Sequence, residues 1–174
     1  MVKTSKDQIQ LDEIKVLDAL KQNSKENIDE IAKNCEFSRQ KVWRIIKNLE
    51  KNKIIWGHTA IADEEAYGFK HYVLLVIRSL EPIAESHKKE IVFDKLDNYL
   101  PGLVKIEDIY YTHGTYDLVI TFYASQILHA KNFIKALFNK NNKLFKDYLL
   151  LETIFPIRKK NLKNPQIKKL VEYL

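Results

Sequence analysis

The chain has 174 residues, of which 45% are hydrophobic and 30% charged, a composition typical of one medium or two small globular domains and not of a disordered protein. No apolar run is long enough to cross a bilayer, and residues 1–10 are too polar for a signal peptide, so we expect a cytoplasmic protein without a membrane partner. The single cysteine, Cys35, excludes an internal disulfide and a cysteine-based zinc cluster, and its apolar surroundings predict a buried thiol.

The formal net charge of +6 is concentrated at the two ends of the chain. Residues 1–56 carry 12 Lys and Arg against 9 Asp and Glu, residues 57–156 carry 11 against 13, and residues 157–174 carry 6 against 1. Within residues 38–53, six cations face a single acid, Glu50. A localised excess of this kind indicates a polyanionic partner, whereas a diffuse excess does not.

Three short helices are predicted in the first third of the chain. The first has apolar residues at roughly helical spacing and ends at Gln22, and these residues are Ile9, Leu11, Ile14, Leu17 and Leu20. The second follows a capping box formed by Asn27 and Glu30, and its apolar side consists of Ile28, Ile31, Ala32 and Cys35. Ser38 caps the third helix, whose apolar residues are Val42, Ile45, Ile46 and Leu49.

The second and third helices are separated by only Glu36 and Phe37, which predicts a helix-turn-helix. In that arrangement the later helix enters the DNA major groove with its N-terminal residues against base edges. The face opposite the aliphatic row carries Arg39, Gln40, Trp43, Arg44 and Lys47, and together with Ser38 and Lys41 these are the predicted DNA-binding residues. Arginine can pair with guanine and glutamine with adenine, while lysine and arginine can also hold phosphates. The alternatives are a merely solvated helix face and, for Trp43, packing near Trp56 at the domain junction.

The rest of the chain has the pattern of an α+β domain. An extended linker with a polar turn is expected at residues 57–69, and a domain with the order βαββαβ at residues 70–157. Its strands are predicted at residues 71–77, 106–112, 116–123 and 146–155, and its helices at 83–100 and 125–138. This order predicts a ferredoxin-like sandwich after an N-terminal helix-turn-helix, winged-helix-like domain at residues 1–56. From the second helix we expect Ile127, Leu128, Phe133, Ile134 and Leu137 in the core.

The first predicted strand is apolar on both sides. Tyr72, Leu74 and Val76 point one way, and Val73, Leu75 and Ile77 point the other. Because two helices can cover only one face of the sheet, we expect a second copy of the chain to cover the other. Docking of the N-terminal domain is the alternative.

Signals for catalysis, metals or cofactors are lacking in the sequence. The four glycines form no phosphate-binding loop or dinucleotide fingerprint. The five histidines, His58, His71, His87, His113 and His129, show no metal-ligand spacing. We therefore expect no cofactor, no metal site and no enzymatic activity.

The last segment, residues 158–174, is a basic tail. After Pro165, residues Ile167, Leu170, Val171 and Leu174 recur at near-helical spacing, which favours a short amphipathic helix. A basic surface tail with no specific role is the alternative.

Three stretches resemble the Lrp/AsnC (feast/famine) family of bacterial and archaeal transcription regulators. They are EIAKNCEFSRQKVWRIIKNLEKNKII, similar to the family's helix-turn-helix, GHTAIADEEAYGF, similar to its linker strand, and HGTYDLVITFYA, similar to its Gly-x-Tyr-Asp turn. The resemblance covers about residues 11–160. It implies a sequence-specific regulator of double-stranded DNA, a hinge strand at residues 57–61, and homodimers that assemble further into rings such as octamers. It also implies a small effector such as an amino acid near the turn formed by His113, Gly114, Tyr116 and Asp117.

The sequence departs from the family's pattern in several places. Glu36 and Lys53 stand where the family usually has glycine, so we expect Asn34 or Asn52 to take the left-handed conformation instead. Thr115 replaces a commonly acidic residue, which leaves open another effector, or none, and a plain hairpin turn at Gly114. A second resemblance, to siroheme decarboxylase subunits, would give His113 a role in tetrapyrrole chemistry. The third alternative is a non-specific, chromatin-like DNA-binding protein.

Overall fold

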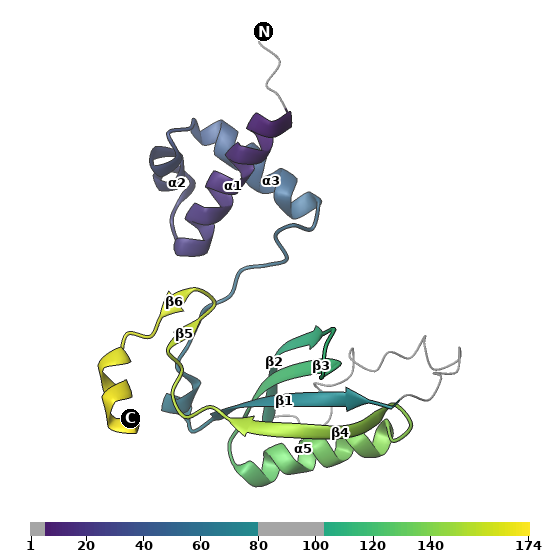
Figure 1. Ribbon diagram of the computed structural model, residues 1–174. Coiled ribbons are helices and arrows are strands. Elements are labelled where there is room, and N and C mark those ends of the chain that lie inside the picture. The colour runs from purple at the N-terminus through teal and green to yellow at the C-terminus, as the bar shows by residue number, and fades with distance from the viewer. Residues whose placement is uncertain (1–5, 80–102) are drawn as a thin grey trace. The chain divides into compact units, whose positions relative to one another are not determined.

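The computed structural model describes residues 6–79 and 103–174 (Figure 1). The chain divides into two compact units. The first comprises residues 1–61 with 157–172 and 174, and the second comprises residues 62–156 with 173. No helix in the described ranges is both long and apolar enough to cross a membrane.

The first unit contains the helices α1 (Lys6–Gln22), α2 (Ile28–Cys35) and α3 (Arg39–Lys51). The predicted capping box is present: Asn27 Oδ1 accepts a hydrogen bond from Glu30 N at 2.9 Å, and Asn27 N donates to Glu30 Oε2 at 3.3 Å. Ser38 Oγ accepts from Lys41 N at 3.3 Å and caps α3. These caps satisfy backbone N–H groups that have no partner within the helix, and they fix where α2 and α3 begin.

The core of the three helices confirms the predictions for α2 and α3. Its buried residues are Val16, Ile31, Ala32, Cys35, Val42, Ile45 and Leu49. The first predicted helix is present as α1, but its apolar residues Ile9, Leu11 and Ile14 lie outside this core and are 47%, 60% and 46% exposed. The helix packs instead through the side that carries Asp12 and Val16, both of which are buried.

The left-handed residues of this unit are Glu36 and Lys53, each with φ of 56°. The prediction that Asn34 or Asn52 would take this conformation was wrong. Cys35 is buried in the core and still belongs to α2, so the chain can reverse only at the next residue, Glu36. The Phe37 N–H then donates to the Ala32 carbonyl at 2.9 Å and closes the helix end.

The segment at residues 57–63 has no regular secondary structure, so the hinge strand implied by the resemblance is not formed within this chain. A 3₁₀ turn, η1 (Glu64–Tyr67), follows it and ends at Gly68, whose φ of 79° suits a glycine.

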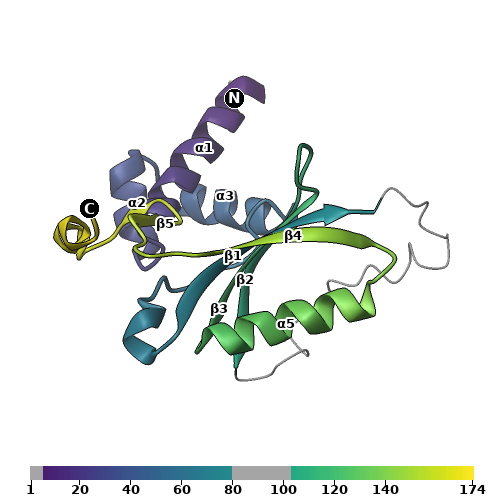
Figure 2. The same cartoon turned by 60° about the horizontal axis from the view of Figure 1, so that its bottom comes forward.

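The second unit is built on a four-stranded antiparallel sheet. Its strands are β1 (Lys70–Arg78), β2 (Val104–Tyr111), β3 (Leu118–Ala124) and β4 (Phe145–Glu152), arranged in the order β2-β3-β1-β4. Helix α5 (Ile127–Lys140) lies against one face of this sheet (Figure 2). The predicted α+β class with a ferredoxin-like sheet is therefore confirmed. The helix predicted at residues 83–100 lies outside the described residues.

The core of this unit lies between the sheet and α5. Tyr72, Leu74, Val76, Leu118, Ile120 and Phe122 from the sheet meet Ala130, Phe133, Ile134 and Leu137 from the helix. The expectation for Ile127 and Leu128 was wrong, because they are 44% and 58% exposed. They belong to the first turn of α5, at the margin of the side that packs on the sheet.

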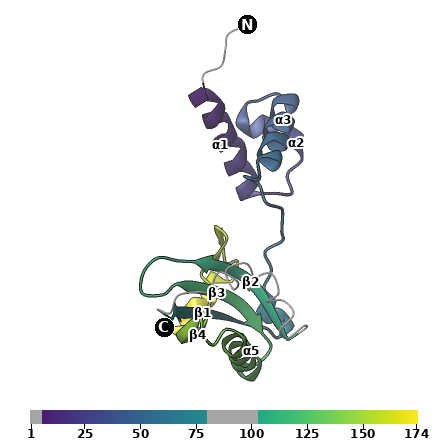
Figure 3. The same cartoon turned by 90° about the vertical axis from the view of Figure 1, so that its right-hand side faces the viewer.

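The opposite face of the sheet is also apolar. Val73 pairs with Leu151 and Leu75 with Leu149 in the β1–β4 register, and all four side chains point to this face. Leu149 and Leu151 are 42% and 46% exposed. Among the described residues of this unit, no helix lies on this face (Figure 3).

The C-terminal segment differs from its prediction. Strands β5 (Arg158–Lys159) and β6 (Leu162–Lys163) form a hairpin that was not predicted, and residues after Pro165 form a 3₁₀ helix, η3 (Ile167–Tyr173), instead of an α-helix. The two-residue turn is possible because Lys160 and Asn161 both take positive φ, 43° and 76°. Such a turn matches the twist of a short hairpin, and asparagine tolerates it well.

Candidate nucleic-acid interface

The outer face of α3 carries the predicted DNA-binding residues that make the fewest side-chain contacts within the described part of the chain. Gln40, Trp43 and Arg44 are exposed, Trp43 by 53%. A surface hollow at the start of α3 is lined by Ser38, Arg39, Gln40, Lys41, Trp43 and Arg44. Within the described part of the chain, neither Gln40 nor Arg44 has a side-chain hydrogen bond or an ion pair, so both are available to an external partner.

Arg39 and Lys47 are held only by exposed ion pairs. Arg39 Nη1 lies 2.7 Å from Asp29 Oδ2, and Lys47 Nζ lies 2.8 Å from Glu50 Oε2. Exposed pairs of this kind contribute about 0–1 kcal/mol. A DNA phosphate or base can therefore replace the carboxylate at little cost.

Lys41 occupies a different environment from the other predicted residues. Its Nζ lies 2.6 Å from Asp12 Oδ2 and 3.7 Å from the centre of the Phe37 ring. The hydrogen bond from Lys41 lowers the pKa of Asp12 below its usual value, against the opposing effect of burial. Lys41 therefore joins α3 to α1, and we remove it from the set of phosphate-binding candidates. The physical reason is that Lys41 lies on the flank of α3 beside Asp12 of α1 and not on the outer face of α3.

Lys51 was absent from the predicted set but lies on the same side of α3. Gln40, Arg44, Lys47 and Lys51 follow one another at spacings of four, three and four residues, which aligns them along one side of the helix. Lys51 is exposed, and no ion pair to it occurs among the described residues. The spacing alone could have identified it from the sequence.

The alternative placement of Trp43 against Trp56 was wrong. Trp56 is 95% exposed, which is incompatible with packing between the two indole rings. Trp43 thus remains a side chain that faces outward from α3 beside Gln40 and Arg44.

The predicted effector residues lie in the connection between β2 and β3. His113 and Gly114 are exposed, and Gly114 has φ of 150°. One carboxylate oxygen of Asp117 accepts from Arg78 N at 2.8 Å, and the Asp117 N–H donates to the Val76 carbonyl at 2.9 Å. Asp117 therefore holds the end of β1, and among the described residues its other carboxylate oxygen has no hydrogen bond.

Comparison with known proteins supports the architecture described above. A family model described as winged helix-turn-helix DNA-binding matches residues 12–55. A curated relative from Bacillus subtilis (strain 168), the uncharacterized HTH-type transcriptional regulator YugG, is 24% identical over 123 residues, which are 70% of this chain and 71% of that protein.

Several solved structures share the fold over most of their length. An AsnC family transcriptional regulator from Agrobacterium tumefaciens is 21% identical with a TM-score of 0.64, and the match covers 85% of this chain and 92% of that one. LrpC from B. subtilis is 20% identical with a TM-score of 0.61, and the match covers 89% and 99%. A transcriptional regulator from Neisseria meningitidis, solved in complex with L-Met, is 15% identical with a TM-score of 0.64, and the match covers 85% and 91%. This chain therefore carries a winged helix-turn-helix DNA-binding domain and has the two-domain fold of the Lrp/AsnC family of transcriptional regulators.

Proposed function

We propose that the chain is a sequence-specific transcriptional regulator that binds double-stranded DNA as a homo-oligomer. The observation that carries this proposal is the outer face of α3, where Gln40 and Arg44 have no partner among the described residues and stand beside the exposed Trp43. The three side chains lie on the later helix of a helix-turn-helix, near its N-terminal end, the part that meets base edges in this motif.

The proposed roles follow from the side-chain chemistry. Gln40 pairs with adenine and Arg39 or Arg44 with guanine, while Lys47 and Lys51 hold phosphates. Trp43 contacts a thymine methyl group or a sugar. Ser38 contributes indirectly, because its hydroxyl caps α3. Residues 1–56 form the reading domain, residues 57–69 link it to the sheet domain, and residues 70–157 serve assembly and effector binding.

Self-association through the sheet is supported by the apolar face around Leu75, Leu149 and Leu151. Leucines exposed side by side on a sheet are costly in water, and a second sheet of the same kind is the simplest cover for them. A dimer would present two copies of α3 to two half-sites. Further assembly into rings such as octamers would follow from the resemblance to the family. We place this activity in the cytoplasm of a bacterium or archaeon.

An effector site is proposed at His113, Gly114, Tyr116 and Asp117. The L-Met complex of the Neisseria regulator motivates an amino acid as the first ligand to test. The free carboxylate oxygen of Asp117 would receive its amino group. A thermal-shift screen of the twenty amino acids against wild type and Asp117→Ala tests this, and a stabilisation that Asp117→Ala retains would place the ligand elsewhere.

The regulator proposal is tested by selection of binding sites from a pool of random duplex DNA. A sequence-specific dimer should enrich a pseudo-palindromic motif with half-sites about 10 base pairs, or a multiple of this, apart. Recovery of random sequence would instead favour the chromatin-like alternative. If the protein bound no DNA, a spectroscopic titration with a tetrapyrrole would test the siroheme-decarboxylase alternative through the exposed His113.

A further inference from the structure

We infer that the C-terminal segment of residues 158–174, here called the basic tail, is a second DNA-binding element that contacts phosphates without reading sequence. This inference rests on the proposed function, because it assigns the tail to the same DNA. It concerns residues outside the helix-turn-helix, most of which lie beyond the stretch, about residues 11–160, that resembles the regulator family.

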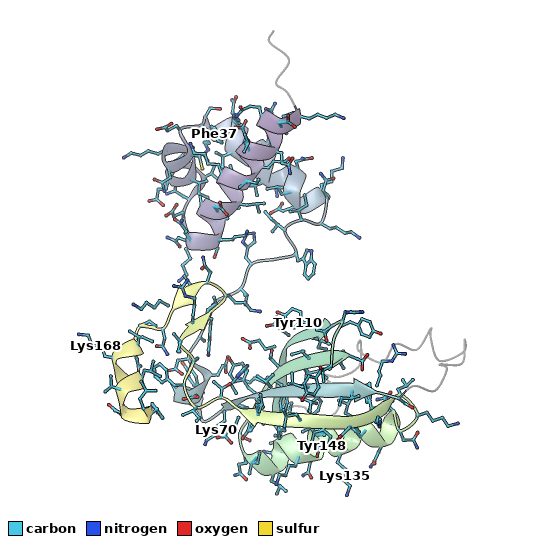
Figure 4. All side chains as sticks on the ribbon, viewed as in Figure 1. Phe37, Lys70, Tyr110, Lys135, Tyr148 and Lys168 are labelled. Atoms are coloured by element: carbon cyan, nitrogen blue, oxygen red, sulfur yellow. The ribbon has the colours of Figure 1, made fainter. Side chains whose placement is uncertain are left out.

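The charge of the basic tail is almost entirely positive. It contains Arg158, Lys159, Lys160, Lys163, Lys168 and Lys169, and Glu172 is its only acidic residue. Lys163, Lys168 and Lys169 are exposed, and none of the three makes an ion pair among the described residues. Figure 4 shows Lys168 on η3 with its side chain directed away from the ribbon. These amines are available to a polyanion.

The hairpin of β5 and β6 brings like charges together, and their repulsion lowers the stability of the free protein. Arg158 on β5 is paired directly with Lys163 on β6, and like charges at opposing positions of an antiparallel pair destabilise it. The turn between the two strands adds Lys160. A ligand that carries several negative charges would relieve this repulsion.

The arrangement suits a phosphate backbone better than a single anion. Lys163 lies in β6, whereas Lys168 and Lys169 lie in η3, so the amines are distributed over two elements and do not converge on one point. Repeated charges spaced along a partner would engage such a surface, and DNA is the polyanion that we propose the helix-turn-helix of the same chain binds. Because phosphates are common to all sequences, these contacts would add affinity without specificity.

Salt dependence is the measurement that isolates these contacts. Each phosphate contact contributes about 0.9 to the slope of log affinity against log salt concentration. A triple variant with Lys163→Gln, Lys168→Gln and Lys169→Gln should therefore lower the slope by about 2.7. Raising the salt concentration from 50 to 200 mM should lower the DNA affinity of both proteins, and the factor of loss should be about 40 times larger for the wild type than for the variant.

A matched control removes the same charge elsewhere. Lys131, Lys135 and Lys143 are exposed in or just after α5, and Figure 4 shows Lys135 on that helix. Their triple change to Gln gives the same net charge. Fluorescence anisotropy with a scrambled 30-base-pair duplex should show the wild-type slope for this control and the reduced slope for the tail variant only.

Two results would overturn the inference. A tail variant with the wild-type slope would show that the tail does not contact DNA. If this variant also bound phosphatidylserine vesicles more weakly than the wild type does, the tail would be assigned to an anionic membrane instead. An equal loss of slope in both variants would show an effect of total charge. Failure of the proposed function looks different, because the wild type would then bind no duplex or would bind all duplexes without sequence preference, and neither result depends on the tail variant.

Discussion

Lys41 Nζ lies 2.6 Å from Asp12 Oδ2, and this contact joins α3 to α1 across the edge of the helical core. Asp12 is a buried carboxylate, and Gln8 Nε2 also donates to it at 3.1 Å. A buried acid requires such partners, because a carboxylate without them is costly to desolvate. The pair therefore fixes how the first helix supports the helix that we propose reads DNA.

Asp12→Asn should lower the free energy of unfolding by about 1–3 kcal/mol at pH 7, because it weakens a charged hydrogen bond and leaves the Lys41 ammonium without its carboxylate. The control is Asp18→Asn, whose exposed partner Lys21 lies 3.9 Å away, and it should change stability by less than about 0.5 kcal/mol. Urea denaturation of the two variants measures the difference. An equal effect of the two changes would contradict this role of Asp12.

The same pair predicts a pH dependence of stability. The pKa of Asp12 is lowered in the folded protein, chiefly by the hydrogen bond from Lys41. Its contribution is thus fully present above the unfolded pKa of about 4 and is lost as pH falls through the lower folded pKa. The stability gap between wild type and Asp12→Asn should accordingly narrow below about pH 4. A gap that stays constant down to pH 2 would show that the charge is not involved.

Glu36→Gly should stabilise the helical unit. Glu36 has φ of 56°, a conformation that costs a residue with a side chain about 1–2 kcal/mol. Glycine avoids this cost but loses more entropy on folding, so we expect a net gain of about 0.5–1 kcal/mol. Lys33→Gly, inside α2, is the opposite control and should lose about 1 kcal/mol. Thermal melts of the two variants measure these changes. If Glu36→Gly lowered the stability, the 4.0 Å contact of Glu36 with Lys15 would contribute more than the left-handed backbone conformation costs.

Leu151→Lys should weaken the proposed oligomer. Leu151 lies beside Val73 on the open face of the sheet and is 46% exposed, so the folded subunit should tolerate a charge that a sheet-to-sheet interface would not. Sedimentation should show the wild type at twice the 20.6 kDa chain mass or more and the variant shifted toward one chain. Leu128→Lys, on the exposed side of α5, should leave the assembly unchanged. A monomeric wild type would contradict the proposal.

Gln40→Ala should relax base preference. Loss of a bidentate contact with a base costs about 1–3 kcal/mol at the contacted pair and little on other sequences. Lys47→Ala should instead weaken binding to all duplexes alike and lower the salt slope by about 1. Titrations of the selected motif and of single-base variants separate the two effects. A uniform loss with Gln40→Ala would mean that Gln40 contacts only the DNA backbone.

Most of the fold could be predicted from the sequence because strong local signals coincide with tertiary packing. The caps at Asn27 and Ser38 and the alternating strand of Tyr72 to Val76 form as expected. The orientation of α1 could not be predicted, because its aliphatic residues occur on more than one side and the ion-pair partner of Asp12, Lys41, comes from α3. The C-terminal hairpin was also missed, since its strands are two residues each and carry no periodicity.

Most residues of the candidate DNA-binding face were predicted from the sequence, but a contact between helices removed Lys41 from the set. The outward row on α3 follows from helical spacing alone, which places Gln40, Arg44 and Lys51 together. The spacing cannot show that Lys41 has a partner on α1, since Asp12 is 29 positions away in the chain and only folding brings the two together.

The proposed function requires that the chain discriminates between DNA sequences. The most direct test is fluorescence anisotropy of the full-length protein with the DNA upstream of its own gene and with a scrambled duplex of equal length, at two salt concentrations. We predict tighter binding to the upstream DNA, with a preference that persists at the higher salt concentration, where the phosphate contribution is weakened. Equal affinity for both duplexes, lost together as salt rises, would contradict sequence-specific recognition at its own promoter.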